Sequence, residues 1–383
     1  MDMFTRVEPK RQSFEVVDDY TSKDIISEKK ELFHDLFSEY STQGFPRWKR
    51  LELSDFKKVP IKKYEGNFVK SGNVQLSGES IEKREYRDFL LEKFEGVDLK
   101  FVLMALIFFN AGMFKEINGN EKIDLIYDLS KNNVLIENSG LILRKHSSAF
   151  LVREYRSGGN FLNSASKFFL NSGSSLKIFN VFINPKTDLL ISSNLYDLEE
   201  SANLEVYDVI FGGQKMALDH LANLKGKSSR AIFKTVYFGR GRERLDLRYE
   251  IDHYGENTYG RIESNGVLAD ESYSVVRGNI DIKSTAYNAD SEEKSHVINL
   301  SSRARADSIP SLFVDNSNVS ARHGSAVGNI DENKLYYLMS RGLDERSAIK
   351  LIISGIFEPV INELPPDNAD LKGEIEDAMS IRI

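Results

Sequence analysis

Short runs in which apolar and polar residues alternate fill this chain from about residue 140 to about residue 320. The run ERLDLRYEIDHYG is the clearest, because it puts Leu245, Leu247, Tyr249 and Ile251 on one side of an extended backbone and charged residues on the other. Successive side chains of a β-strand point to opposite faces, so this period of two predicts a strand with one buried face. The runs LKIFNVFINP and GNIDIKSTAY repeat the pattern, which predicts many short strands in the middle of the chain.

The segments between these runs are rich in Gly, Asn, Asp and Ser, the residues that tight turns require. A sandwich, a barrel and a β-helix are all compatible with short strands that are joined in this way. No clean consensus repeat accompanies the alternation, so periodicity alone does not choose among the three architectures.

Other patterns precede the strands. Residues 21–43 carry apolar side chains at steps of three and four, which predicts an amphipathic helix that Gly44 and Pro46 bring to an end. The apolar run after Leu99 is followed by NAG and by a second apolar piece up to Ile117. We interpret this segment as a buried strand and a turn.

Helical periodicity returns after the strands. Asp331 can cap a first helix, Gly342 stands where a glycine is expected just past its end, and Asp344 can cap a second helix. Pro359 is expected to break or restart the second helix, and the LPP sequence at residues 364–366 is expected to end it. The acidic tail that follows can form one more helix.

The composition excludes several classes of function. With a net charge of −7, the chain has no general attraction for nucleic acid or for anionic lipid. Its longest apolar run, FVLMALIFF, is far shorter than the roughly 20 residues that a helix needs to cross a bilayer. The first residues, MDMFTRVEPKRQSFEVVDDY, lack the layout of a signal peptide. We therefore expect a cytoplasmic protein whose partners include neither nucleic acid nor a membrane.

The chain contains no cysteine, so it cannot by itself supply a disulfide, a thiolate nucleophile or a cysteine-ligated cluster. It also lacks the GxxxxGK[ST] motif, and it is not expected to hydrolyse nucleotide alone. None of its six histidines stands at the HxH or HxxxH spacing of a local metal site. One of them, His323, lies among small residues at a glycine-rich junction between strand and helix, where it can either bind a ligand or pack.

The C-terminal third carries a more specific signal. Residues 298–361 read INLSSRARADSIPSLFVDNSNVSARHGSAVGNIDENKLYYLMSRGLDERSAIKLIISGIFEPVI. This segment resembles the core of the SufB/SufD family, whose members are scaffold components of the Suf iron–sulfur cluster assembly system. The residues that match the family pattern are Ala304, Arg305, Ala306, Asp307, Pro310, His323, Gly324, Gly328, Asp331, Tyr336, Tyr337, Leu338, Ser340, Arg341, Gly342, Ala348 and Gly355. The residues that match the preceding family segment are His253, Gly266, Val267, Leu268, Gly278 and Thr285, so the resemblance covers roughly residues 250–360.

The resemblance implies a fold that the alternation left open. It implies a mainly β protein with a right-handed parallel β-helix core at residues 96–328. An N-terminal helical domain at residues 1–95 and a C-terminal helical domain at residues 329–383 are expected to flank this core.

The resemblance also implies partners. Family members form a SufB–SufD pair, and each C-terminal helical domain binds one copy of the ATPase SufC. SufB-like chains carry a functional cysteine on a late core strand, so a chain without cysteine resembles the SufD branch. The expected partners are therefore a SufC-like ATPase and a SufB-like subunit, or a second copy of this chain where that subunit is missing.

Five candidate site residues follow from the resemblance. His323 falls on the family histidine proposed to place iron or cluster atoms at the subunit interface, and imidazole is a suitable ligand for ferrous iron. Tyr336, Tyr337, Arg341 and Phe357 are candidates for the contact with the ATPase, because exposed aromatic and arginine side chains often anchor interfaces. No metal is expected to be held by this chain alone, and no cofactor is expected to bind it tightly. The cluster would lie only transiently at the interface of the complex.

The family pattern is incomplete near His323. The cysteine that usually stands two residues before the histidine is replaced by Ala321, and the usual pair of aspartates by Ser317 and Asn318. These changes argue against strong iron binding by this subunit alone, and they favour a mainly structural role.

The sequence thus predicts a SufD-like scaffold without catalytic residues, which supports cluster assembly and iron acquisition. One alternative is a β-helix carbohydrate-active enzyme that uses paired carboxylates, although such enzymes are mostly secreted. The other alternative is a transporter-associated subunit, because SufC resembles transport ATPases.

Overall fold

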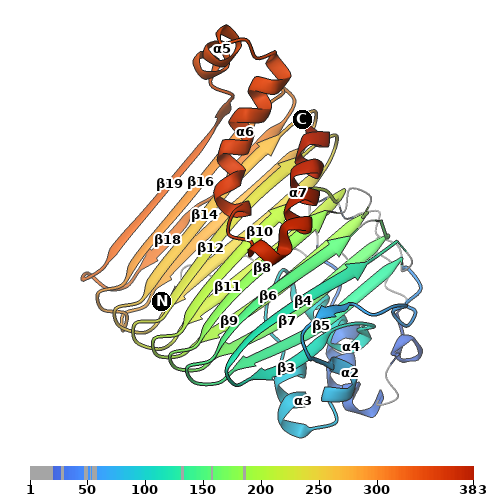
Figure 1. The fold of residues 1–383 in the computed structure, drawn as a ribbon. Coiled ribbons are helices and arrows are strands. Elements are labelled where there is room, and N and C mark those ends of the chain that lie inside the picture. The colour runs from blue at the N-terminus through green and yellow to red at the C-terminus, as the bar shows by residue number, and fades with distance from the viewer. Residues whose placement is uncertain are drawn as a thin grey trace.

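The fold is taken from a computed structural model of the whole chain, which describes residues 20–26, 30–46, 51, 53, 58–130, 133–156, 158–183 and 187–383 (Figure 1). Two long sheets face each other, and consecutive strands alternate between them along most of the chain. Except for the edge strand of each sheet at the first turn, neighbouring strands pair in parallel, which is the arrangement of a parallel β-helix. The fold class implied by the family resemblance is therefore confirmed.

The nine-stranded sheet follows the order β1-β4-β6-β8-β10-β12-β14-β16-β19. Its strands are β1 (Val69–Ser71), β4 (Asn120–Asp128), β6 (Ser148–Arg156), β8 (Ser175–Ile183), β10 (Asn203–Ile210), β12 (Arg230–Gly239), β14 (Tyr259–Leu268), β16 (Asp290–Asn299) and β19 (Ser320–Asn329).

The ten-stranded sheet follows the order β17-β15-β13-β11-β9-β7-β5-β3-β2, and β18 also pairs with β15. Its strands are β2 (Gln75–Leu76), β3 (Met113–Ile117), β5 (Val134–Leu143), β7 (Phe161–Leu170), β9 (Leu189–Leu198), β11 (Lys215–Leu224), β13 (Arg244–His253), β15 (Tyr273–Ile282), β17 (Arg305–Ser308) and β18 (Ser311–Val314).

The core lies between the two sheets. Equivalent residues on neighbouring strands stack in columns, for example Val206, Phe233 and Ile262, all of which are almost completely buried. Leu245, Leu247, Tyr249 and Ile251 belong to this interior, as the alternation predicted. Burial of these continuous apolar columns supplies the main stabilisation of the β-helix.

The first turn of the β-helix is covered. Strands β1 and β2 pair antiparallel with β4 and β3, respectively, so they close the sheet edges at this end. Helices α2 (Ser77–Ser80), α3 (Arg84–Leu91) and α4 (Leu99–Phe108) lie beside the first strands in Figure 1. Helix α1 (His34–Thr42) packs against α4. Two short 3-10 turns, Ser22–Asp24 and Lys30–Phe33, precede α1.

Two predictions for the N-terminal part are wrong. Residues 99–108 form the helix α4 rather than a strand, and only Met113–Ile117 is extended. Every residue of α4 from Lys100 to Phe108 is buried, so the helix has no polar face and its sequence shows no helical period. The predicted helix at residues 21–43 is also shorter, because α1 covers only His34–Thr42; residues 27–29 lie outside the described part of the chain.

The predicted start of each of the two C-terminal helices agrees with the structure. Asp331 caps α5 (Glu332–Ser340), Asp344 caps α6 (Glu345–Ile361), and Gly342 has a positive φ of 98°. The acidic tail forms α7 (Ala369–Arg382). Pro359 neither breaks nor restarts α6, because it lies in the last turn, where a proline removes a single backbone hydrogen bond.

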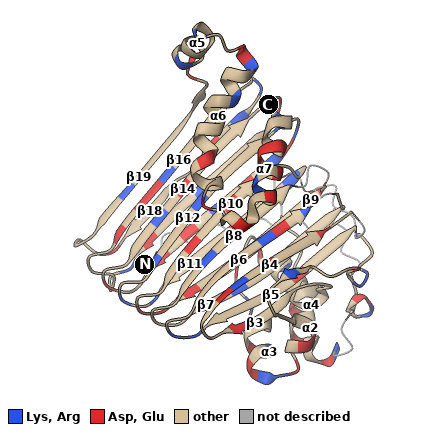
Figure 2. Ribbon diagram, in the orientation of Figure 1, with Lys and Arg blue, Asp and Glu red and all other residues tan. Residues whose placement is uncertain are grey.

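Helices α6 and α7 pack on the outer face of the nine-stranded sheet, whereas α5 projects beyond the last turn (Figure 1). Phe357 stacks on Phe211 with a ring separation of 5.7 Å. Ion pairs between the sheet and the tail include Lys177–Glu363 and Arg156–Glu374. Figure 2 shows positive and negative residues interspersed along the visible strands and helices.

Candidate functional site

The last strand of the nine-stranded sheet, β19, is an open edge. It pairs with β16 on one side, and within the described part of the chain no strand pairs with its other side. Nine of its ten residues are exposed. Small residues such as Gly324, Ala326 and Gly328 make the edge flat and leave its backbone accessible. This end of the β-helix therefore differs from the first turn, which β1 and β2 cover.

His323 lies in β19, directly opposite Glu293 of β16. Its side chain lies on the inner face of the sheet, because Ala321, two residues earlier, packs against the interior cluster. His323 is nevertheless exposed, since no further turn of the β-helix covers it. The structure thus puts this sequence-predicted residue at the mouth of the β-helix rather than on an outer wall.

Glu293 was missed by the sequence analysis. Its side chain is only 1% exposed, and neither carboxylate oxygen has a hydrogen-bond partner among the described residues. Burial raises the pKa of Glu293 to about 7, although the nearby backbone N–H of Gly324 lowers it. A glycine at position 278 makes room for this side chain, since a Cβ there would lie 2.3 Å from the Glu293 Cγ. No sequence signal marked Glu293, because its neighbours come from distant segments.

Other buried oxygen atoms near the mouth also lack partners within the described part of the structure. They are the hydroxyl oxygens of Ser264, Ser295 and Ser308, and Ser295 follows Glu293 on the same inner face. Ser264 and Ser295 are neighbours in register, and Ser325 of β19 continues their column to the exposed edge. The interior of the last turns therefore holds buried polar groups without partners among the described residues.

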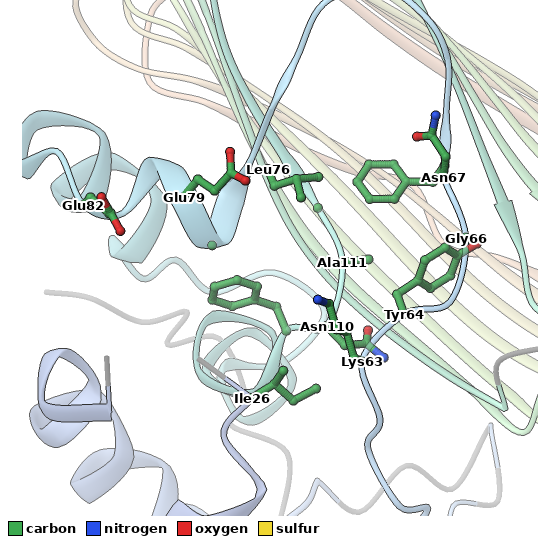
Figure 3. Close-up of a pocket in the computed structure, with 14 residues that line it drawn as sticks. Ile26, Lys63, Tyr64, Gly66, Asn67, Leu76, Glu79, Glu82, Asn110 and Ala111 are labelled. Atoms are coloured by element: carbon green, nitrogen blue, oxygen red, sulfur yellow. The ribbon is translucent and has the colours of Figure 1, made fainter. Parts of the chain in front are cut away.

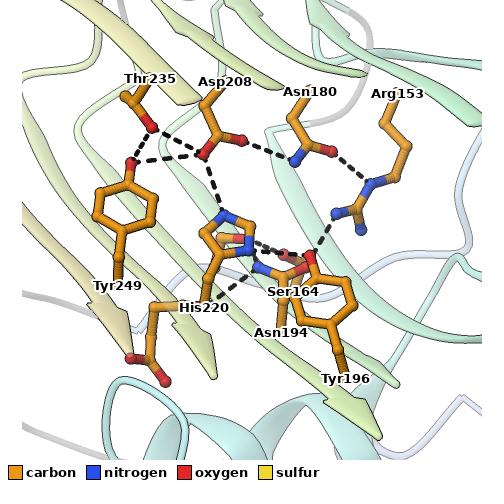
Figure 4. A network of polar contacts seen from close by, with 11 residues as sticks. Arg153, Ser164, Asn180, Asn194, Tyr196, Asp208, His220, Thr235 and Tyr249 are labelled. Carbon is orange, nitrogen blue, oxygen red and sulfur yellow. Dashed lines mark hydrogen bonds and ion pairs between the residues drawn. The ribbon is translucent and has the colours of Figure 1, made fainter. Parts of the chain in front are cut away.

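The same polar column continues deeper into the β-helix, where its groups are paired (Figure 4). Asp208 accepts hydrogen bonds from Asn180 and from the Thr235 hydroxyl, and its carboxylate lies 3.2 Å from the His220 Nε2. Burial raises the pKa of Asp208, but His220 and Asn180 outweigh this effect and hold it below its usual value. His220 Nδ1 also lies 2.9 Å from the Tyr196 hydroxyl. This network is sealed from solvent, and we assign it a structural role.

The candidate docking residues do not all lie at the surface. Tyr336 is 76% exposed and Tyr337 is 56% exposed, and Arg341 lies over the Tyr337 ring at 5.2 Å. Helix α5 contains no buried residue. Phe357, by contrast, is fully buried against Phe211, so the expectation that it is exposed was wrong. It packs α6 on the sheet and cannot contact a partner in this conformation.

A cavity of about 580 Å³ lies at the other end of the β-helix (Figure 3). Tyr64, Phe68 and Phe109 contribute its aromatic wall, and Glu79 and Glu82 lie at its rim. None of the five candidate site residues lines it. We therefore do not assign it to the site at β19.

The described residues contain no cluster of three or more His, Cys, Asp or Glu side chains that could hold a metal ion. None of their helices has the length and apolar character needed to span a membrane.

Replacing Glu293 by glutamine is expected to stabilise the protein at alkaline pH. Because the folded-state pKa is about 7, against an ordinary value of 4.5, folding disfavours the charged form. The penalty is absent near pH 4 and complete above pH 8, where it reaches at most about 3 kcal/mol. Urea unfolding at pH 5 and pH 8.5 should show a gain for the variant that is larger at pH 8.5. An equal gain at both pH values would contradict the buried, unpaired carboxylate.

Comparisons with known proteins place most of the β-helix in one protein family. The family model described as SUF system FeS cluster assembly, SufBD core domain, matches residues 127–356. The iron–sulfur cluster assembly protein SufD of Bacillus subtilis is 39% identical over 147 residues, which cover 38% of this chain and 34% of that protein.

More distant relatives cover more of the chain. The SufB protein of Bacillus subtilis is 27% identical over 185 residues, which cover 46% of this chain and 40% of SufB. An iron–sulfur cluster assembly SufBD family protein of Mycobacterium tuberculosis is 25% identical over 243 residues, or 61% of each chain. The matches thus span between about a third and three fifths of the length of these relatives.

Proposed function

The chain belongs to the SufBD core family of the SUF iron–sulfur cluster assembly system, and from this premise we propose that it is a SufD-like scaffold subunit without catalytic activity. It pairs with a SufB-like subunit, or with a second copy of itself where that subunit is missing. It also docks a SufC-like ATPase, and the complex supports cluster assembly and iron acquisition in the cytoplasm. Family membership favours this role over a carbohydrate-active enzyme or a transporter subunit.

The open edge at β19 is the observation that carries the proposal. Exposed edge strands promote association, and most proteins cover them or interrupt them with charged or irregular residues. This chain covers the edges of its first turn with β1 and β2, but it leaves a ten-residue edge at β19. A subunit that adds a strand to this edge would satisfy its backbone groups, as in other cases of strand addition.

Pairing at β19 would bring the partner beside His323. An imidazole can bind ferrous iron, while thiolates bind cluster iron more strongly. This chain has no cysteine, so any thiolate at the interface must come from the SufB-like partner. The iron or cluster is the cargo of the complex, held transiently, and is not a cofactor of this chain.

The exposed helix α5 supports a separate docking surface for the ATPase. Tyr336 and Tyr337 are large aromatic side chains on a helix without buried residues, and Arg341 lies beside Tyr337. Side chains of this kind dominate the binding energy of many interfaces once they are buried. Met339 and Leu351 are also exposed on α5 and α6 and enlarge the apolar area of this surface.

Co-expression with the SufB-like and SufC-like proteins of the source organism tests both contacts. We expect the wild-type chain to co-purify with both, and light scattering to give a mass that fits two ATPase copies per scaffold pair. Replacing Tyr336 and Tyr337 by alanine should remove the ATPase from this chain and leave the SufB-like subunit bound. The affinity of the double variant for the ATPase should fall at least tenfold, since hot-spot aromatic residues each contribute about 2 kcal/mol or more.

Tyr287→Ala is the matched control, because Tyr287 is 52% exposed but lies in a turn of the β-helix. It should leave both contacts unchanged. Failure of the wild-type chain to bind either protein would contradict the proposed function. Retention of the ATPase by the double variant would contradict only the docking surface on α5.

A further inference from the structure

We propose that Glu293 is a second ligand, next to His323, for a divalent cation of the ferrous class at the mouth of the β-helix. The inference rests on the proposed function, because it assigns a further residue to the place where iron is expected. The ion would then lie inside the last turn and not on the outer edge of β19.

The strand register places Glu293 beside His323. Glu293 and His323 are direct partners on neighbouring parallel strands, which lie about 4.8 Å apart. Both side chains lie on the inner face, and the backbone N–H of Gly324 is close enough to Glu293 to affect its carboxylate. A carboxylate and an imidazole in adjacent positions of one face can bind the same ion.

Glu293 and His323 belong to one inward-facing column of residues in register along the nine-stranded sheet. The preceding turns place Val206, Phe233 and Ile262 at the equivalent position, and all three are buried and apolar. Only the last two turns carry ionisable residues there, namely Glu293 and His323. If this position served packing alone, an apolar residue would be expected in β16 as in the other strands. The change of chemistry coincides with the exposed end of the β-helix.

The buried carboxylate of Glu293 lacks a close partner among the described residues. A buried carboxylate without a hydrogen bond or an ion pair is costly, and such groups are rare in native proteins. Within the described structure neither oxygen of Glu293 has a hydrogen-bond partner of normal geometry, with only the backbone N–H of Gly324 nearby, although only 1% of the side chain is exposed. Gly278 leaves the space that this side chain occupies. A bound cation would compensate the buried negative charge and use both free oxygens.

The donor set defines the class of ion. One carboxylate and one imidazole suit ferrous iron and the related ions Co²⁺, Mn²⁺ and Zn²⁺. The hydroxyl groups of Ser295 and Ser325 lie in the adjacent column and can hold water molecules that complete the coordination. Two protein ligands from this chain leave positions for a thiolate of the SufB-like partner, so binding should be weak until the partner arrives.

Anaerobic titration of the purified chain with Co²⁺ tests the inference, because cobalt reports its ligands through its visible absorption. We expect one Co²⁺ per chain and a spectrum that includes a nitrogen ligand. Glu293→Gln and His323→Ala should each weaken binding about tenfold or more. A second readout is stability, since Co²⁺ should raise the unfolding midpoint of the wild type but not that of Glu293→Gln.

Glu292→Gln is the matched control. Glu292 precedes Glu293, points to the outer face and pairs with Lys294 at 2.9 Å. This variant removes one carboxylate from the same strand, and it should bind Co²⁺ like the wild type. Loss of binding in Glu292→Gln as large as that in Glu293→Gln would overturn the assignment to the interior.

The outcomes separate this inference from the proposed function. If His323→Ala weakens binding and Glu293→Gln does not, Glu293 is not a ligand and the inference fails, while the role of His323 stands. If the wild type binds no Co²⁺, or if a high-resolution structure in Co²⁺ shows only water at Glu293, the inference also fails. Co-purification with the SufB-like and SufC-like proteins then still decides the proposed function.

Discussion

Replacing Arg153 by alanine is expected to lower the free energy of unfolding by about 3–5 kcal/mol. Arg153 is 1% exposed and donates hydrogen bonds to Asn180, Ser166 and Asn194 at 2.8–2.9 Å (Figure 4). Its loss would leave three acceptors without donors and a cavity between the sheets. It would also remove the positive charge near the buried Glu137, whose field helps to keep the pKa of Arg153 high.

Urea unfolding of the isolated chain measures the loss of stability in Arg153→Ala. Two further variants serve as comparisons. Arg153→Lys keeps the charge but cannot reproduce the planar set of donors, so an intermediate loss is expected. Arg303→Ala removes an arginine whose side chain is 72% exposed, and it should change the stability by no more than about 0.5 kcal/mol. An Arg153→Ala variant as stable as Arg303→Ala would show that the interior network contributes little.

Replacing Phe357 by alanine is expected to cost about 3–5 kcal/mol and to release the C-terminal helices from the sheet. Phe357 is fully buried in the cluster that joins α6 to the outer face of the nine-stranded sheet. Its ring stacks on Phe211 of that face. Amide hydrogen exchange should therefore accelerate in α6 and α7, while the strands of the first turns remain protected.

Leu351→Ala is the control on the same helix, since Leu351 is 53% exposed and should alter stability by no more than about 0.5 kcal/mol. Unchanged exchange in α6 of the Phe357 variant would contradict the packing role. The comparison also separates packing from docking. Phe357→Ala should destabilise the isolated chain, whereas alanine at Tyr336 and Tyr337 should affect only the bound ATPase.

The periodic parts of the fold could be predicted from local sequence. The alternation at Leu245, Leu247 and Tyr249 identified a buried strand face, and Asp331 and Asp344 identified the starts of two helices. These signals are local, because a strand face and a helix cap are each defined within a few residues. Helix α4 was missed for the same reason, since a helix that is buried on all sides has no local period.

The β-helix itself could not be derived from the alternation. Paired residues on adjacent turns are separated by as few as 26 and as many as 32 positions, as the pairs Leu189–Lys215 and Tyr273–Arg305 show. Because the turns differ in length and the inner columns accept many apolar residues, the sequence shows no fixed repeat. The choice of a β-helix over a sandwich or a barrel came from the resemblance to a family.

Local sequence was enough to predict the strand faces, the helix caps and the lack of a thiolate, and the family pattern singled out His323 as a candidate. The burial of Phe357, the open edge at β19 and the pairing of Glu293 with His323 follow from the packed fold and could not be predicted from local sequence. The physical reason is that parallel pairing joins residues a whole turn apart, and their distance in sequence carries no chemical signal. Solvent exposure is likewise a property of the packed molecule, because it depends on which elements cover a residue.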